Sequence, residues 1–145
     1  MLLMLMLVND DKFYPKLSFQ YTPYIFGPAP MPLIEVKFEK LPKPVWSLVD
    51  SGASMSIIHP KVASVAGIKF DIQKPITGSG VGSSYRYFMG TPIDITINHI
   101  SRNLKFSVIA NDDFMWGCIL GHDFFKEAKV IFKTYKKEFD IFFRK

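Results

Sequence analysis

The sequence predicts an all-β domain with one or two short helices, folded as a closed barrel. The chain of 145 residues contains 14 Phe and 6 Tyr together with frequent Val and Ile, and these residue types favour strands. Several segments alternate apolar and polar residues with a period of two, as half-buried strands do. Clusters of Gly, Pro and Asn separate these segments and are typical of turns.

The first predicted hairpin leads to a single aspartate. Residues 34–38 alternate apolar and charged side chains, and the Pro-containing segment 41–44 turns the chain. Residues 45–49 form the second strand, which ends at Asp50. We therefore expect this hairpin to hold one carboxylate at the end of a buried strand.

The middle of the chain alternates short elements with turns. We expect a short strand over residues 55–58 and a helix over 60–66, with Pro60 in its first turn and Gly67 closing it. Residues 70–76 are expected to be extended.

A Gly-rich segment at residues 78–84 lies between the flanking segments 76–77 and 85–89. This pattern predicts a flexible loop at the tip of a β-hairpin. The remaining predicted elements are strands over 92–100 and 104–110 with a polar turn at 98–101, a very short buried strand at 119–120, a helix over 122–128, and a closing hairpin of 129–132 with 138–143.

The N-terminal region differs in composition from the rest. Residues 12–32 hold five prolines and several aromatic residues, which disfavour helix and predict an arm on the surface. We divide the chain into an N-terminal arm or extension, residues 1–30, and one domain, residues 31–145. Residues 1–8 are apolar but lack a basic flank and a cleavage pattern, and a membrane span needs about 20 apolar residues. Membrane association is therefore not expected.

Size, charge and cysteine content limit the classes of protein further. A chain of this length can bury about 70% of its unfolded surface without metals or disulfides. The only cysteine, Cys118, excludes an internal disulfide and is compatible with a reducing compartment. We expect a cytoplasmic location.

Seven of the 18 Lys and Arg residues lie at or after residue 122, in a chain of net charge +5. Such a cluster could contact nucleic acid or an acidic partner. However, these cations alternate with apolar residues, as on the solvent side of a sheet. A solvated face is the favoured interpretation, and nucleic acid is not the expected partner.

The segment Asp-Ser-Gly at residues 50–52 is suited to acid–base chemistry on a water molecule. Peptide hydrolysis needs a base that takes a proton from water and an acid that protonates the carbonyl oxygen. Two neighbouring carboxylates that share one proton can fill both roles. Asp112 and Asp113 lack a following Ser/Thr-Gly, so neither is the expected second carboxylate. The second aspartate is then expected to come from a second copy of the chain.

Two other kinds of site fit the sequence poorly. The Gly-rich segment 78–82 is not followed by the Lys-Ser/Thr of a phosphate-binding loop. Cys118 and His122 have the spacing of metal ligands, but no carboxylate cluster completes a site, and Cys118 is better explained as a small buried residue. No metal and no cofactor is expected.

A serine triad is also disfavoured, because the sequence places no His with an orienting acid near Ser51 or Ser54.

Two motifs together resemble the retropepsin-like aspartic proteases of retroviruses, retrotransposons, cells and bacteria. The first is Val-Asp-Ser-Gly-Ala at residues 49–53, and the second is Ile-Leu-Gly at 119–121, followed by Asp-Phe-Phe. The Gly-rich hairpin lies between them, and the resemblance covers roughly residues 32–143. It implies the acid protease fold, a homodimer and hydrolysis of peptide bonds, with peptides or proteins as substrates. It also implies, as an alternative to the cytoplasm, a location inside a retroelement or viral particle.

The resemblance also implies roles for individual residues. Asp50 corresponds to the catalytic aspartate, Ser51 to the hydroxyl residue that links the active-site loops across the dimer, and Gly52 to the glycine whose carbonyl faces the substrate. Ala53 and Gly121 would support this loop. The flap that covers a bound peptide would include Gly78, Ser79, Gly80, Val81 and Gly82, and the floor of the cleft Ile119 and Leu120.

Three positions depart from the retroviral pattern. Ser54 and Met55 stand where many retroviral enzymes have acidic residues, and His122 stands where they place an Arg. These departures favour a cellular, bacterial or retrotransposon-like member. The principal hypothesis is an aspartic endopeptidase, and the alternative is a retropepsin-fold dimerisation or peptide-binding module without catalysis.

Overall fold

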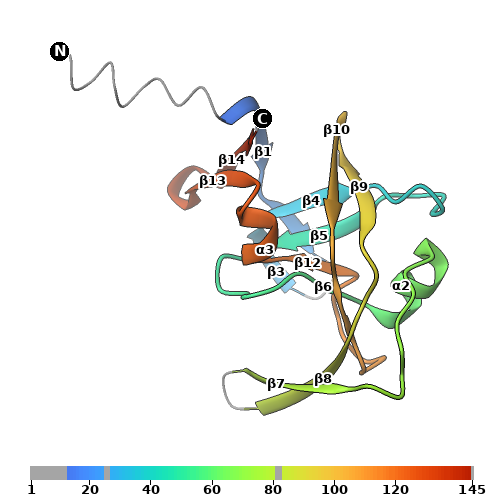
Figure 1. Cartoon of the computed structure of the whole chain (residues 1–145). Helices are drawn as coiled ribbons and strands as arrows, with labels where there is room; N and C mark the ends of the chain where they lie inside the picture. Colours follow the sequence, from blue (N-terminus) through green and yellow to red (C-terminus); the bar gives the residue numbers. More distant parts are fainter. Residues whose placement is uncertain (1–12, 25–26, 81–82, 145) are drawn as a thin grey trace. The chain divides into compact units, whose positions relative to one another are not determined.

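The computed structural model describes residues 13–24, 27–80 and 83–144, and these residues are mostly strand with a few short helices. The chain separates into two compact units. The central unit comprises residues 33–124, and the terminal unit comprises residues 1–32 together with 125–145. Figure 1 shows the course of the chain through both.

A seven-stranded sheet forms the central unit. Its strand order is β4-β5-β12-β6-β11-β8-β7, and a separate two-stranded sheet pairs β9 with β10. The bounds are β4 (Leu33–Val36), β5 (Val45–Val49), β6 (Ile57–Ile58), β7 (Ile76–Gly80), β8 (Ser83–Met89), β9 (Ile93–Ile97), β10 (Ile100–Leu104), β11 (Ser107–Ile109) and β12 (Cys118–Leu120). No pairing joins β4 to β7 in the described part of the chain, so the sheet is open and the expected closed barrel is not found.

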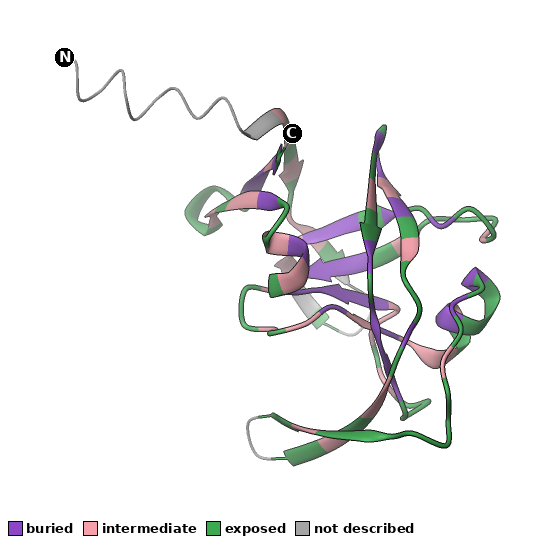
Figure 2. Ribbon diagram, viewed as in Figure 1, coloured by how far each residue is buried: buried purple, intermediate pink, exposed green. Residues whose placement is uncertain are grey.

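The core of the central unit lies on β4, β5 and β12, whose ribbons are largely purple in Figure 2. The side chains of Ile34, Val36 and Leu120 are at most 1% exposed. In β4 the exposed Glu35 lies between the buried Ile34 and Val36, because successive side chains of a strand point to opposite faces. The hairpin of β4 and β5 that the sequence predicts is confirmed, with Leu33 opposite Leu48.

Helix α2 (Pro60–Ala66) is confirmed at the predicted residues. It begins at Pro60, with the imidazole Nδ1 of His59 accepting a hydrogen bond from the Lys61 N–H at 3.1 Å. It ends at Gly67, whose φ of 86° is the left-handed conformation that glycine adopts without a Cβ penalty.

Three predicted elements need correction. Residues 70–76 form a turn up to the start of β7, because the Asp71 side chain accepts a hydrogen bond from the Gln73 N–H at 2.9 Å. The expected strand 104–110 belongs to two elements. Leu104 ends β10, which pairs with β9 after a turn at Asn98, where φ is 55°. Residues 107–109 form the separate strand β11. Helix α3 (His122–Phe125) is shorter than predicted, since the Glu127 carbonyl already accepts from the Arg144 N–H at 2.9 Å.

The terminal unit is built on a three-stranded antiparallel sheet in the order β1-β14-β13. Its elements are β1 (Phe13–Gln20), β2 (Thr22–Tyr24), β3 (Gly27–Met31), β13 (Ala128–Lys133), the 3₁₀ turn η1 (Thr134–Lys136) and β14 (Glu138–Arg144). The closing hairpin of β13 and β14 is confirmed. The described residues between 13 and 31 form the three strands β1, β2 and β3 where a surface arm was expected, and the domain boundary at residue 30 stays a prediction.

Candidate active site

Asp50 lies at the end of β5, which pairs in parallel with β12. Val49 is opposite Leu120, and the Asp50 N–H continues the pairing by donating to the Leu120 carbonyl at 3.0 Å. The two signature motifs, 49–53 and 119–121, are thus brought together as neighbouring strands. This backbone hydrogen bond fixes the position of Asp50 on the sheet, and it does not involve the Asp50 side chain.

The turn after Asp50 orients the carboxylate. The Gly52 N–H donates to Asp50 Oδ1 at 2.8 Å, and the Ala53 N–H donates to the Asp50 carbonyl at 3.2 Å. Asp50 is half-buried, whereas Ser51 and Gly52 are exposed. One carboxylate oxygen is therefore fixed by the turn in a place that solvent reaches.

Gly121 lies at the point where the second motif meets the loop of the first. It is buried, and a Cβ added to it would lie 2.6 Å from the Met55 carbonyl oxygen and 2.7 Å from that of Ala53. Both neighbours are backbone atoms, so only glycine lets the two segments approach this closely. Gly121 thus contacts the loop that the resemblance implied it supports, and its role in an active site stays a prediction.

A network between Ser56 and Asp123 supports this approach from the side. The Ser56 N–H lies 2.9 Å from both carboxylate oxygens of Asp123, and the Ser56 hydroxyl donates to Oδ1 at 2.5 Å. The same hydroxyl accepts from the Gly121 N–H at 3.0 Å, and the Phe124 N–H donates to Asp123 Oδ1 at 2.8 Å. The network joins the loop after Asp50 to the start of α3.

His122 contacts the turn that follows Asp50 directly. Its N–H donates to the Ala53 carbonyl at 2.9 Å, and its ring Nε2 lies 2.6 Å from the carbonyl oxygen of Ser51. The imidazole therefore donates to that carbonyl, since a carbonyl oxygen can only accept. His122 is the residue that stands where many retroviral enzymes place an Arg.

The β7–β8 hairpin carries the Gly-rich segment, of which residues 81 and 82 (Val81 and Gly82) lie outside the described residues. Gly80 pairs with Ser83, Ser79 with Ser84, and Gly78 with Tyr85. A Cβ on Gly78 would meet the Tyr85 ring at 2.7 Å, so glycine leaves room for the ring to pack across the hairpin. The hairpin is present, and its role as a flap stays a prediction.

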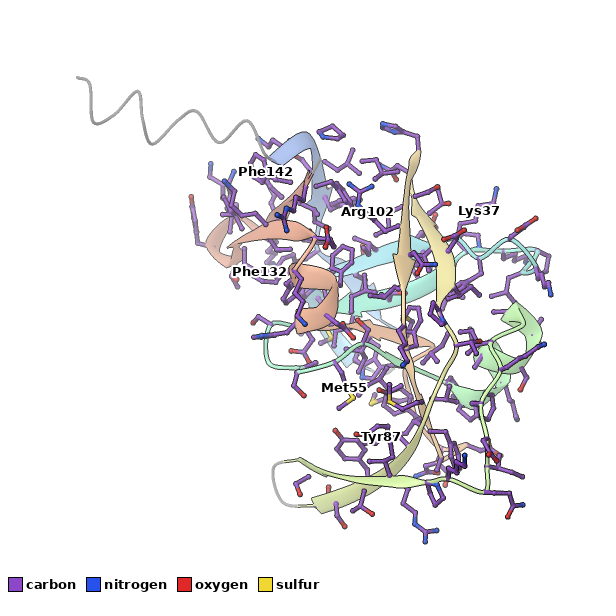
Figure 3. All side chains as sticks on the ribbon, in the orientation of Figure 1. Lys37, Met55, Tyr87, Arg102, Phe132 and Phe142 are labelled. Carbon is purple, nitrogen blue, oxygen red and sulfur yellow. The ribbon has the colours of Figure 1, made fainter. Side chains whose placement is uncertain are left out.

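Two adjoining clefts lie along this hairpin and share the residues Ser84, Tyr85, Ile109 and Asn111. The inner cleft has a volume of about 370 Å³ and is also lined by Ile57, Ser83 and Phe114. Figure 3 shows Met55 and Tyr87 on the elements that bound this region, the loop after β5 and strand β8.

The outer cleft has a volume of about 640 Å³, and its further lining residues are Thr77, Arg86 and Ala110. Neither cleft is lined by Ile119 or Leu120, which are 8% and 0% exposed on β12. These two residues lie beside Asp50 in the sheet, and their role as a cleft floor stays a prediction.

Cys118 is completely buried on β12. Burial raises the pKa of its thiol to about 12, although a hydrogen bond with Ser47 acts in the opposite direction. The prediction of a small buried residue at this position is confirmed. Among the residues the structure describes, no group of three or more His, Cys, Asp or Glu is arranged to hold a metal ion, and no helix is long and apolar enough to cross a membrane.

Reasoning from the sequence missed the supporting roles of Ser56 and Asp123 and the cleft residues Arg86 and Asn111. Asp123 lies two residues after the second motif, so its nearness to the loop could have been inferred from the sequence. Arg86 and Asn111 carry no motif, and only the pairing of β8 with β11 brings their segments together.

The chain resembles known proteins both in sequence and in fold. Residues 34–127 match the family described as "gag-polyprotein putative aspartyl protease". No curated protein sequence matches the chain. A retropepsin-like aspartic protease from Rickettsia conorii has a similar fold, with a TM-score of 0.62, 16% identity, and coverage of 89% of this chain and 92% of that chain.

A second solved structure, the retroviral protease-like domain of Ddi1 from Leishmania major, aligns with a TM-score of 0.52 and 19% identity, over 73% of this chain and 79% of that chain. Both structural matches concern the fold, and the sequence match covers more than half of the 145 residues, including both signature motifs. The chain therefore belongs to the gag-polyprotein aspartyl protease family, with a retropepsin-like fold.

Proposed function

We propose that the protein is an aspartic endopeptidase that acts as a homodimer, with Asp50 of each copy forming the catalytic pair. The observation that supports this most directly is the hydrogen bond from the Gly52 N–H to Asp50 Oδ1 at 2.8 Å, which orients a solvent-accessible carboxylate. Membership of the family supports the same chemistry.

In this mechanism the two carboxylates share one proton. The ionised Asp50 takes a proton from a water molecule as that water attacks the peptide carbonyl carbon, while the protonated Asp50 of the other copy gives its proton to the carbonyl oxygen. The β7–β8 hairpin acts as a flap that covers the peptide and excludes bulk water. Gly121 and the Ser56–Asp123 network keep the loop that carries Asp50 in place.

Substitution of Asp50 tests the chemistry. Asp50→Asn keeps the size of the side chain but removes the base, so cleavage of a fluorogenic peptide library is expected to stop while the protein stays folded. Asp94→Asn is the matched control, because Asp94 is an exposed carboxylate on β9. Undiminished cleavage by the Asp50→Asn variant would refute the mechanism.

Mixing the two proteins tests the dimer. If both copies supply Asp50, a ninefold excess of Asp50→Asn chains leaves about one wild-type chain in ten with a wild-type partner, and activity per wild-type chain falls roughly tenfold. Activity that stays constant would show that one chain suffices. A wild-type protein that binds extended peptides and never cleaves them would instead support the alternative, a peptide-binding module of the same fold.

A further inference from the structure

One peptide group in the turn after Asp50 forms hydrogen bonds at both of its ends. The Gly52 N–H donates to Asp50 Oδ1 at 2.8 Å, and the carbonyl of the same peptide group, which belongs to Ser51, lies 2.6 Å from His122 Nε2. The imidazole donates to this carbonyl, because a carbonyl oxygen only accepts. His122 is therefore connected to the Asp50 carboxylate through a single peptide group.

The turn that contains this peptide group has two alternative geometries. The Ala53 N–H donates to the Asp50 carbonyl at 3.2 Å, so residues 50–53 form a β-turn with the peptide between Ser51 and Gly52 at its centre. Type I and type II turns differ by a rotation of this central peptide of about 180°. Type II needs a positive φ at the third residue of the turn, which glycine adopts without a Cβ penalty. Gly52 therefore permits both geometries.

The structure has the orientation that directs the Gly52 N–H to the carboxylate. Gly52 is not among the described residues with a positive φ, so the turn is not of type II. After a rotation to type II, the Gly52 N–H would point away from Asp50 Oδ1, and the Ser51 carbonyl would point away from His122. Because glycine itself allows either geometry, the two hydrogen bonds of the peptide group hold the observed one.

The backbone around His122 places its imidazole beside the turn. The His122 N–H donates to the Ala53 carbonyl at 2.9 Å, and Gly121 allows the two segments to approach closely. Asp123, the titratable neighbour of His122 on α3, faces Ser56, whose N–H and hydroxyl both donate to its carboxylate. The carboxylate next in the chain thus binds a different part of the loop, and the imidazole binds the turn.

We propose that His122 is a positioning residue for Asp50, because its imidazole N–H holds the peptide between Ser51 and Gly52 with the Gly52 N–H directed at Asp50 Oδ1. This inference rests on the proposed function, in which Asp50 activates water. Donation to the carbonyl of a peptide group polarises its N–H and strengthens the hydrogen bond that the N–H donates. A hydrogen bond accepted by an ionised carboxyl favours that form, which is the form that takes a proton from water.

Kinetics of two substitutions at His122 test this role. His122→Leu removes the donor, whereas His122→Gln retains an N–H at the end of a flexible side chain. For His122→Leu, kcat is expected to fall roughly three- to tenfold, as for the loss of one hydrogen bond, with KM close to that of wild type. The acid limb of its pH–rate profile is expected to move to higher pH by about half a unit. His122→Gln should restore most of both quantities.

His99→Leu is the matched control for these measurements. His99 is an exposed residue in the turn between β9 and β10, so its replacement removes an imidazole from the surface at a distance along the chain from both motifs. Its kcat, KM and pH–rate profile should match those of wild type.

Nuclear magnetic resonance tests the same contact without peptide cleavage. The Gly52 amide proton donates to the Asp50 carboxylate, so its resonance should shift as that carboxylate is protonated, and Asp50→Asn should abolish the shift. His122→Leu is expected to reduce the shift strongly, and His122→Gln to retain it. If wild type cleaves no peptide, this result still supports the positioning role, although the proposed function then fails.

Two outcomes would overturn the inference even when the protein is an active protease. One is equal impairment of His122→Leu and His122→Gln, which would mean that the imidazole acts by packing and not as a donor. The other is a lower melting temperature of His122→Leu with kcat, the pH–rate profile and the Gly52 titration all as in wild type, which would mean that the contact serves stability alone.

Discussion

The carboxylate of Asp123 binds both the backbone and the side chain of Ser56, which lies 67 positions earlier in the chain. The Ser56 N–H lies 2.9 Å from each oxygen, and its hydroxyl donates to Oδ1 at 2.5 Å. Because that hydroxyl also accepts from the Gly121 N–H at 3.0 Å, one buried side chain joins the end of the Asp50 loop to the second motif.

Removal of the Ser56 hydroxyl is expected to lower the stability of the protein. Ser56→Ala leaves the buried Gly121 N–H and one Asp123 oxygen without this partner, which costs about 1–3 kcal/mol in the free energy of unfolding. Urea denaturation measures the difference. Ser64→Ala, at an exposed position of α2, is the control and should change stability by less than about 0.5 kcal/mol. A comparable small change for Ser56→Ala would show that the network is not important for stability.

Addition of a methyl group at Gly121 is expected to disrupt the loop that follows Asp50. The new Cβ would lie within 2.7 Å of two backbone carbonyl oxygens, so the segments must separate, at a cost of about 1–3 kcal/mol or more. Gly27→Ala is a suitable control, since a Cβ there meets nothing within 4 Å. The melting temperature and the rate of peptide cleavage should both be lower for Gly121→Ala than for wild type, and unchanged for Gly27→Ala. Equal melting temperatures for the two variants would contradict the close packing seen at Gly121.

The Cys118 thiol is expected to be unreactive until the protein unfolds. Burial raises its pKa to about 12, so at pH 8 it is protonated as well as shielded from reagents. Reaction with a thiol-specific chromogenic reagent should be slow for the folded protein and fast in urea. Rapid labelling under native conditions would mean that β12 opens readily.

The same thiol has a consequence for stability at high pH. Its folded-state pKa lies above the ordinary value of 9.0, so the unfolded chain loses this proton first. The contribution of Cys118 is complete below about pH 9 and declines as the pH rises toward 12. Cys118→Ala should therefore lose less stability than wild type between these two pH values, as measured by urea denaturation.

In the terminal unit, Asp140 is expected to make the free energy of unfolding depend on pH in the acid range. Burial acts to raise the pKa of this carboxyl, but hydrogen bonds from Lys133 and Ser18, with the charges of Lys133 and Lys16, outweigh it and lower the pKa. A lowered pKa gives stability that is present above the ordinary value of 3.8 and lost as the pH falls below it.

The Asp140→Asn variant tests this dependence. Its free energy of unfolding should fall less than that of wild type as the pH is lowered from about 5 to about 2. Glu39→Gln, at an exposed position in the central unit, serves as the control and should follow wild type. Identical pH profiles for Asp140→Asn and wild type would show that the Lys133 pair does not stabilise the fold.

Much of the fold follows from patterns that act over a few residues. The hairpin of β4 and β5, helix α2 and the hairpin of β13 and β14 were predicted because alternation, a first-turn Pro and a closing Gly act locally. The turn at residues 70–76 was missed because the Asp71 side chain accepts a hydrogen bond from the Gln73 N–H, and this contact competes with extended structure. The closed barrel was not found because closure depends on pairing between the two edges of the sheet, which alternation along one strand does not specify.

By itself, the sequence determined that Asp50 ends a buried strand in a Ser-Gly turn, and that Gly121 follows a second, short buried strand, because both depend on local residue types. Only the tertiary structure decided which distant groups hold that turn: the Leu120 carbonyl, the Ser56 hydroxyl and the Asp123 carboxylate. The tertiary structure also decided that Arg86 lines a cleft with Asn111. These groups come from segments 25 to 70 positions apart in the sequence, and they are brought together by the order in which the strands pair.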